Sequence, residues 1–164
     1  GFLAQIKLYG TPSFLSSNGS FFQSMIMTRW LTTFHATHTR LLVFDQFAHT
    51  EIQSLANLPL SLQLFSGGPR TLRGYDYNTI GPGKSMFIAD IELQQKLYSK
   101  LYLTGFYDIG NVSSMPTLFS QTKSSVGGGL AWLSPIGMFE LDYAVALNLP
   151  KKPGKIVFSV GPFL

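Results

Sequence analysis

The stretch from residue 139 to residue 148 alternates between two kinds of side chain, and this pattern constrains the fold most strongly. Large apolar residues stand at Phe139, Leu141, Tyr143, Val145 and Leu147, and between them are Glu140, Asp142, Ala144, Ala146 and Asn148. Successive side chains of a β-strand point to opposite faces of the sheet. The pattern therefore predicts a strand with one apolar face, suited to lipid, and one small or polar face, suited to a lumen.

The same period of two recurs in about eight segments of the chain, each near the length that a tilted membrane strand needs. The predicted strands cover roughly residues 2–9, 20–33, 39–48, 85–96, 101–109, 124–133, 138–147 and 155–163. In the segment 85–96, one face holds Phe87, Ala89, Ile91 and Leu93, and the other holds Asp90, Glu92 and Gln94. A carboxylate that faces lipid near the bilayer midplane costs free energy, so we expect the acidic face to point inward.

The composition selects among the structures that could contain such strands. Charged residues make up 12% of the chain and aromatic residues 14%, and the charged fraction is about half of that in soluble domains. The sequence has no apolar stretch of about 18 residues, which excludes a transmembrane helix, and a closed β-barrel is the other structure that spans a bilayer. We therefore predict an all-β fold, an antiparallel transmembrane β-barrel with about eight strands here. A soluble β-sandwich is the alternative, because its strands also alternate, but the low charge weighs against it.

The predicted connections alternate in length. Those at 34–38, 97–100 and 134–137 are tight, those at 10–19, 49–84 and 110–123 are long, and 148–154 is intermediate. Outer-membrane barrels have short periplasmic turns and longer extracellular loops, so we expect a bacterial outer-membrane protein with both chain ends on the periplasmic side. Aromatic residues also cluster near predicted strand ends, as membrane-interface girdles do: Phe21, Phe22, Trp30, Phe34, Tyr98, Tyr102, Trp132 and Phe163.

Two short patterns resemble ligand-binding motifs but lack essential residues. The stretch Gly81–Ser85 reads GPGKS, like the end of a P-loop, yet Asn78 stands where that motif needs its first glycine. His35 and His38 lie in a predicted tight turn with no carboxylate or third histidine nearby in sequence to complete a metal site. We therefore expect no nucleotide or other cofactor and no bound metal.

Other residue classes also argue against an enzyme. Cysteine is absent, which removes thiol, disulfide and cysteine-zinc chemistry, and no serine sits in a nucleophile elbow. Asp90 and Glu92 could serve acid catalysis, but inward acids in a barrel more often pair with an arginine or line the lumen. The net charge of +4 comes from scattered basic residues, which does not favour nucleic acid as a partner. We expect no catalytic residues.

The stretch Gly67–Lys84, GGPRTLRGYDYNTIGPGK, is rich in glycine and proline and carries two arginines in a chain with few charges. Because the predicted wall has inward carboxylates, this loop is expected to fold into the lumen and to be held there by charge-assisted hydrogen bonds from arginine. The candidate partners on the wall are Asp90, Glu92 and Asp108.

The loop also resembles a known family. The run LPLSLQLFSGGPRTLRGYDYNTIGPG is similar to the sixth extracellular loop of the outer-membrane assembly and secretion superfamily that includes BamA, TamA and the two-partner-secretion transporters. The hallmark of that loop is an apolar residue followed by Arg-Gly-Phe or Arg-Gly-Tyr, which here is Leu72, Arg73, Gly74 and Tyr75. Further matches follow in order: GFYDIGNV, VGGGLAWLSPIGMFELDYAVAL and the ending FSVGPFL, which resembles the TamA-like ending more than the BamA one. The chain thus resembles a TamA-like member of this superfamily, the bacterial surface antigen family. The resemblance covers about residues 55–164.

The resemblance implies a fold larger than this chain. Members of the superfamily have barrels of about sixteen strands, preceded by periplasmic POTRA domains, and this sequence resembles the C-terminal half of such a barrel. The whole chain, 1–164, is then barrel domain with a long inward-folding loop at about 49–84, and the upstream strands and POTRA domains are absent from the sequence. Arg73 corresponds to the loop arginine that contacts the wall, Asp108 to the strand aspartate, and Glu92 to a second acid. We expect Arg73 to pair with Asp108 or Glu92.

The resemblance also implies that the last strand pairs weakly with the first, at a seam that opens. The seam residues are Ile156, Phe158, Val160, Gly161, Pro162 and Phe163. Pro162 cannot donate a ladder hydrogen bond, so it belongs at an edge or a seam. The chain ends in Phe163 and Leu164 and lacks the terminal aromatic residue of many outer-membrane proteins.

By the same resemblance, the function is that of a TamA-like factor that helps β-rich proteins such as autotransporters to insert into the outer membrane or to cross it. Its expected partners are the lipid bilayer, unfolded β-rich clients and an inner-membrane or periplasmic subunit. Two alternatives remain open: a two-partner-secretion transporter that exports a dedicated protein, and a passive porin-like or structural barrel.

Overall fold

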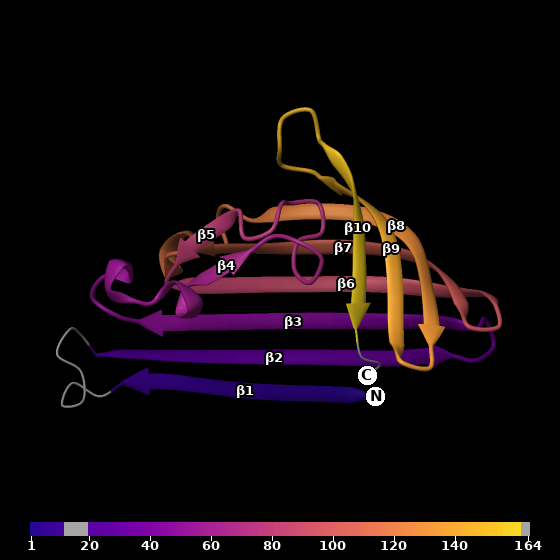
Figure 1. Cartoon of the computed structure of the whole chain (residues 1–164), viewed down its shortest axis with the longest axis horizontal. Coiled ribbons are helices and arrows are strands. Elements are labelled where there is room, and N and C mark those ends of the chain that lie inside the picture. The colour runs from indigo at the N-terminus through magenta and orange to yellow at the C-terminus, as the bar shows by residue number, and fades with distance from the viewer. Residues whose placement is uncertain (12–19, 162–164) are drawn as a thin grey trace.

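The computed structural model describes residues 1–11 and 20–161, and its main element is one curved β-sheet (Figure 1). Eight antiparallel strands follow the order β1-β2-β3-β6-β7-β8-β9-β10. Their bounds are β1 Phe2–Thr11, β2 Phe21–Phe34, β3 Thr39–Glu51, β6 Ser85–Tyr98, β7 Leu101–Ser113, β8 Lys123–Ser134, β9 Gly137–Ala146 and β10 Gly154–Gly161. The predicted all-β antiparallel fold is confirmed.

The eight predicted strands are all present, and the differences lie at their ends. β3 continues to Glu51 and β7 to Ser113, beyond the predicted ends at residues 48 and 109. β3 continues because Glu51 pairs with Phe22 of β2, and β7 continues because Ser113 pairs with Ser85 of β6. The connections after β3 and β7 therefore begin later than predicted, at residues 52 and 114.

The alternation of side chains predicted for residues 139–148 is present in β9. Leu141 and Tyr143 are 53% and 56% exposed, whereas Asp142 and Ala144 between them are 3% and 0% exposed. In β6, Ile91 and Leu93 are likewise exposed, and the neighbouring Glu92 is buried. The acidic faces of β6 and β9 thus point to the inner, concave side of the sheet, as predicted from the free-energy cost of a carboxylate that faces lipid.

The connection between β3 and β6 lies against the inner side of the sheet and contacts β6 and β7 (Figure 1). It contains two short 3-10 turns, Leu55–Asn57 and Leu60–Leu62, and a separate two-stranded sheet of β4 (Leu64–Ser66) and β5 (Ile80–Gly83). We call residues 67–79, between β4 and β5, the inner loop. A third 3-10 turn, Met115–Thr117, lies between β7 and β8.

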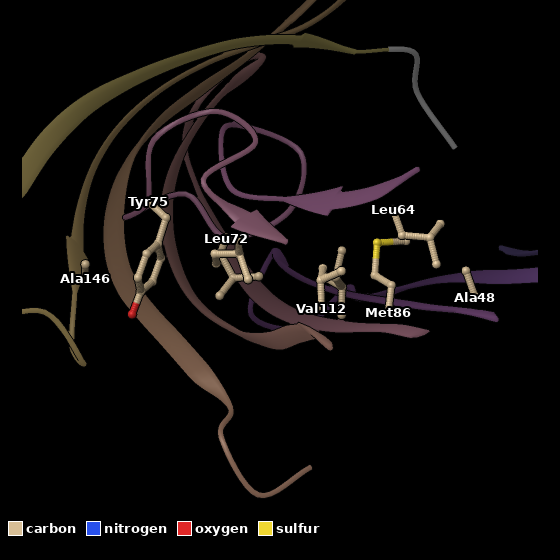
Figure 2. Close-up of a cluster of buried hydrophobic side chains, with 9 residues drawn as sticks. Ala48, Leu64, Leu72, Tyr75, Met86, Val112 and Ala146 are labelled. Atoms are coloured by element: carbon tan, nitrogen blue, oxygen red, sulfur yellow. The ribbon is translucent and has the colours of Figure 1, made fainter. Parts of the chain in front are cut away.

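An apolar core joins this connection to the wall. Figure 2 shows Leu64, Leu72 and Tyr75 of the connection close to wall residues that include Val112 and Ala146. The full cluster is Ala48, Leu64, Leu72, Tyr75, Ile80, Met86, Ile88, Val112 and Ala146. Leu72 is fully buried, and burying one such side chain contributes about 1.5–3 kcal/mol. Packing as well as charge therefore fixes the connection to the wall.

The described part of the sheet has two open edges. β1 pairs with β2 alone and β10 pairs with β9 alone. The described part of β10 ends at Gly161, so the predicted seam residues Pro162 and Phe163 lie outside the described residues. Within residues 1–11 and 20–161, no helix is both long and apolar enough to cross a membrane.

Candidate functional site in the inner loop

The inner loop turns sharply before Arg73, and two glycines make this turn possible. Gly67 and Gly68 have φ angles of 107° and 104°, in the left-handed region that favours glycine. The turn is closed by the N–H of Gly68, which donates to the carbonyl oxygen of Leu72 at 3.1 Å, and by the N–H of Gly67, which donates to Oγ1 of Thr71 at 2.9 Å. This local structure directs Arg73 toward the wall.

Asp108 of β7 binds both the backbone and the side chain of Arg73. The backbone N–H of Arg73 donates to Oδ2 of Asp108 at 2.8 Å, and Nη2 and Nε donate to Oδ1 at 2.8 and 3.1 Å. The hydroxyl of Ser125 also donates to Oδ2, at 2.7 Å. Asp108 is 0% exposed and Arg73 is 5% exposed, so water does not compete with these bonds.

Three further carboxylates surround the same guanidinium. Nη1 donates to Oε2 of Glu92 at 2.6 Å and lies 3.5 Å from Oδ2 of Asp142, and Nη2 donates to Asp90. The four acids come from β6, β7 and β9, so a single loop residue joins three strands of the wall. We call Arg73 with Asp90, Glu92, Asp108 and Asp142 the arginine cluster.

An aromatic ring completes the cluster. The central guanidinium carbon of Arg73 lies 3.3 Å from the ring centroid of Phe106, close enough for a cation–π interaction. Phe106 belongs to a small inner core with Ala144 and Val157. The guanidinium therefore has acids at its edge and an aromatic face below it, a combination that the planar group of arginine fits and an ammonium does not.

Charge in the cluster favours an ionised arginine. Burial by itself lowers the pKa of Arg73, but the nearby carboxylates, first Asp90 and then Asp108, outweigh burial and raise it above the usual value for arginine. Four carboxylates face this one guanidinium, so a neutral replacement would leave buried negative charge without compensation.

The two residues after Arg73 fit tightly against the wall. A Cβ atom on Gly74 would lie 2.7 Å from the backbone nitrogen of Ala146 and 2.8 Å from Cβ of Ser125, so only glycine allows this approach. Tyr75 is 3% exposed, and its hydroxyl donates to Oδ1 of Asn148 at 3.3 Å. Burial raises the pKa of Tyr75, which keeps the hydroxyl protonated as a donor.

The inner loop also contacts the last strand. Nζ of Lys155 donates to the carbonyl oxygen of Tyr75 and lies 3.1 Å from Oδ1 of Asp76, and Nη2 of Arg70 donates to the carbonyl oxygen of Val160 at 3.3 Å. A cavity of about 290 Å³ lies between the loop and the strands β2, β3, β6, β9 and β10. The loop thus links the arginine cluster to β10.

The structure brings together most of the residues that the sequence indicates. Arg73 contacts Asp90, Glu92 and Asp108, but sequence reasoning did not include Asp142 or Phe106. Asp142 could have been found, because it lies on the inward face of the alternating segment 139–148. The partnership with Phe106 had no sequence signal, since it depends on the path of the loop.

The predicted seam residues are placed as far as Gly161. The side chains of Ile156, Phe158 and Val160 are 75%, 59% and 41% exposed on the outer face. The backbone carbonyl of Val160 accepts from Nη2 of Arg70, and the N–H of Ala146 in β9 donates to the carbonyl of Pro153, so the odd-numbered residues of β10 face β9. Because backbone groups of alternate residues point to opposite neighbours in an antiparallel sheet, residues 156, 158 and 160 direct their N–H and C=O groups to the open edge.

Comparison with known proteins agrees with the fold. A model of the Omp85 superfamily domain matches residues 1–162. The outer membrane protein assembly factor BamA of Neorickettsia risticii is 31% identical over 96 residues, which are 46% of this chain and 13% of that protein. The crystal structure of BamA from Haemophilus ducreyi lacking POTRA domains 1–3 superimposes with a TM-score of 0.71 at 19% identity, over 94% of this chain and 37% of that one.

The chain therefore spans only a small part of the curated relative and little more than a third of the solved one. The structural match extends to nearly all of this chain, so its antiparallel sheet has the fold of part of the BamA outer-membrane barrel. Because the family model covers residues 1–162, this protein belongs to the Omp85 superfamily.

Proposed function

We propose that this chain is the C-terminal part of a TamA-like outer-membrane factor that helps β-rich clients, such as autotransporters, to insert into the membrane or to cross it. Membership of the Omp85 superfamily and similarity to a protein named as an outer membrane protein assembly factor support this function. The observation that carries the mechanism is at the edge of β10 away from β9, where the carbonyl oxygen of Val160 accepts a hydrogen bond from the side chain of Arg70 in the inner loop.

The proposed mechanism is strand addition at this edge. In the described part of the chain, Ile156 and Phe158 direct backbone N–H and C=O groups to the edge of β10 away from β9, and Val160 directs its N–H group there. A client strand can pair with such groups as a new member of the sheet. The side chains of the same residues are exposed and apolar, so they lie where a client strand would meet lipid. No covalent bond forms or breaks in this process, so the proposed activity is not enzymatic and needs no cofactor.

The inner loop is proposed to hold the edge strand in a competent position. The arginine cluster anchors the loop to β6, β7 and β9, and Lys155 and Arg70 connect the same loop to β10. Arg70 occupies the Val160 carbonyl that an added strand would use, so client binding would replace a loop contact with a ladder hydrogen bond.

The proposal also includes the orientation of the chain in the membrane, the further domains of the whole protein and its partners. We propose that the short connections and both chain ends face the periplasm, and that further barrel strands and POTRA domains precede this segment in the whole protein. An inner-membrane or periplasmic subunit would then deliver or drive clients from that side. Unfolded β-rich proteins and the lipid bilayer are the other proposed partners.

A pair of substitutions at one position tests the mechanism. The full-length protein is reconstituted in liposomes, a urea-unfolded autotransporter β-domain is added, and its folding is followed by resistance to protease. Phe158→Pro removes an edge N–H while the bonds from β10 to β9 remain, whereas Phe158→Ala keeps that N–H. We expect client folding to slow with Phe158→Pro and to remain near the wild-type rate with Phe158→Ala.

Equal client folding by the two variants would contradict strand addition at β10. A full-length protein that conducts ions but does not accelerate client folding would support the passive barrel instead. Export of a dedicated soluble partner without client insertion would support the two-partner-secretion alternative.

A further inference from the structure

The outer face of the sheet carries one charged side chain far from a strand end. In the described strands, the outer face has the carboxylates of Asp45 and Glu51, both on β3. Glu51 is the last residue of β3, whereas Asp45 is the central residue of this 13-residue strand. Asp45 therefore lies near the middle of the apolar belt of the barrel, where ionisable groups are rare and most often functional.

The register of the sheet places Asp45 on the outer side. It pairs with Thr28 of β2 and with Ala89 of β6, and Ala89 shares its face with the exposed residues Ile91 and Leu93. The exposed aromatic residues Phe22 and Phe34 lie near the two ends of β2, and Thr28 is halfway between them. Because Asp45 pairs with Thr28, it also lies about halfway between the two ends of the membrane-spanning strands.

Within the described chain, the carboxylate of Asp45 accepts fewer hydrogen bonds than it has acceptor sites. Its one hydrogen bond there is from Oγ1 of Thr28 to Oδ2 at 3.4 Å, and Asp45 is exposed. A carboxylate has about four acceptor sites, so most of them remain open. The neighbouring Ala89 is too small to cover the group from the other side.

Lipid offers no suitable partner at this height. The apolar belt of an outer-membrane barrel is about 25 Å tall, so headgroup amines lie roughly half of that distance from its centre. A basic side chain on another membrane-spanning segment can reach the carboxylate and would be favoured by charge complementarity. The outer face of the described strands carries no lysine or arginine, so this face of a second copy does not supply the cation.

We propose that the outer wall around Asp45 is a docking surface for a membrane-spanning segment of a different protein, which places a lysine or arginine against this carboxylate. Thr28 orients the carboxylate, and Ala89 leaves room for the incoming side chain. The apolar residues Phe47 and Val43, the next outward positions of β3, would flank the contact. The strands β6, β7, β8 and β9 separate β3 from β10 in the described sheet, so the surface does not depend on client binding at that edge.

Chemical protection of the carboxylate tests the proposal directly. Dicyclohexylcarbodiimide is soluble in lipid and modifies carboxyl groups that are accessible from apolar surroundings, but not carboxylates paired with a cation. Native outer membranes that contain the full-length protein are compared with the same protein purified and reconstituted alone in phospholipid vesicles. We expect Asp45 to be modified in the vesicles and protected in the native membranes, with Asp45→Asn identifying the labelled peptide.

A photo-crosslinking arm tests whether recognition depends on charge. A benzophenone side chain replaces Phe47, and a matched probe replaces the outward residue Leu130 of β8. We expect a defined membrane-protein adduct from the first position and not the second, with about tenfold less adduct in an Asp45→Asn background at equal barrel abundance. Equal modification of Asp45 in both membranes, or an adduct that Asp45→Asn leaves unchanged, would overturn the proposal.

Discussion

Asp108 fixes Arg73 through two different parts of the same residue. The backbone N–H and Nη2 of Arg73 each donate to this carboxylate at 2.8 Å. One fully buried side chain of β7 therefore sets both the path of the inner loop and the direction of its guanidinium. The other three acids, Asp90, Glu92 and Asp142, then contact a guanidinium whose position Asp108 has already fixed.

Replacing Arg73 should destabilise the barrel. Removing one partner of a buried ion pair costs about 3–5 kcal/mol, because the other charge is left buried without compensation. We expect Arg73→Ala to lower the midpoint of urea unfolding strongly, and Arg73→Lys to recover only part of the loss, because an ammonium lacks the planar fork that reaches several acids. Both variants are measured by urea unfolding of the full-length protein in lipid, in which folded and unfolded barrels are distinguished by their different mobility on a gel without heating.

Arg70→Ala is the matched control for Arg73→Ala, since Arg70 is an exposed arginine of the same loop. It should change the unfolding midpoint little. If Arg73→Ala were as stable as Arg70→Ala, the arginine cluster would not stabilise the barrel. Client folding, measured at matched barrel abundance, then tests whether Arg73 also acts in assembly. If Arg73→Ala retains full client folding, Arg73 stabilises the barrel and has no further role in client folding.

The two aspartates nearest to Arg73 should differ in importance. The side chain of Asp108 is 0% exposed and that of Asp90 is 17% exposed, and Asp108 alone also binds the loop backbone. We therefore expect Asp108→Asn to destabilise the full-length protein more than Asp90→Asn, as measured by the same urea titration. The reverse order would show that the backbone bond contributes little.

Gly74→Ala should displace the inner loop. Its Cβ would lie 2.7–2.8 Å from atoms of β8 and β9, and overpacking of this kind costs about 1–3 kcal/mol. Gly105→Ala is the matched control, because a Cβ there meets nothing within 4 Å. Protease sensitivity of the loop in intact barrels is the measurement, and equal sensitivity of the two variants would contradict the tight fit at Gly74.

Lys155→Ala should loosen the inner loop without a large loss of stability. The side chain of Lys155 is 29% exposed and that of Asp76 is 83% exposed, and exposed pairs contribute about 0–1 kcal/mol. Hydrogen exchange of the loop segment that ends at Asp76 should become faster while the unfolding midpoint hardly changes. Unchanged exchange in this segment would show that Lys155 does not restrain the loop.

The sequence could predict the features that depend on local periodicity. Alternation at residues 139–148 placed Leu141 outside and Asp142 inside, since a strand turns successive side chains to opposite faces. The strand ends were predicted less well, because pairing of Ser113 with Ser85 depends on the neighbouring strand and not on apolar alternation.

In the candidate site, too, some residues could be predicted from the sequence and some contacts could not. Asp90, Glu92 and Asp108 could be proposed because they are acids on an inward face near a loop arginine. The contact of Phe106 with Arg73 and the bond from Arg70 to Val160 join segments whose distance is set by the curvature of the sheet and the turn at the inner loop. No sequence spacing encodes these contacts.

Cysteine crosslinking of β10 to a client during assembly tests the central claim most directly. These 164 residues contain no cysteine, so Val160→Cys adds one thiol to this segment at the edge of β10, and Leu141→Cys on β9 is the control. Cysteines elsewhere in the full-length protein are replaced by serine. The full-length protein and an autotransporter with single cysteines along its terminal strand are expressed together and oxidised. We predict disulfides between position 160 and one register of the client strand, since neighbouring strands bring Cα atoms to about 5.5 Å. Crosslinks that form equally at position 141, or with no preferred register, would contradict strand addition at β10.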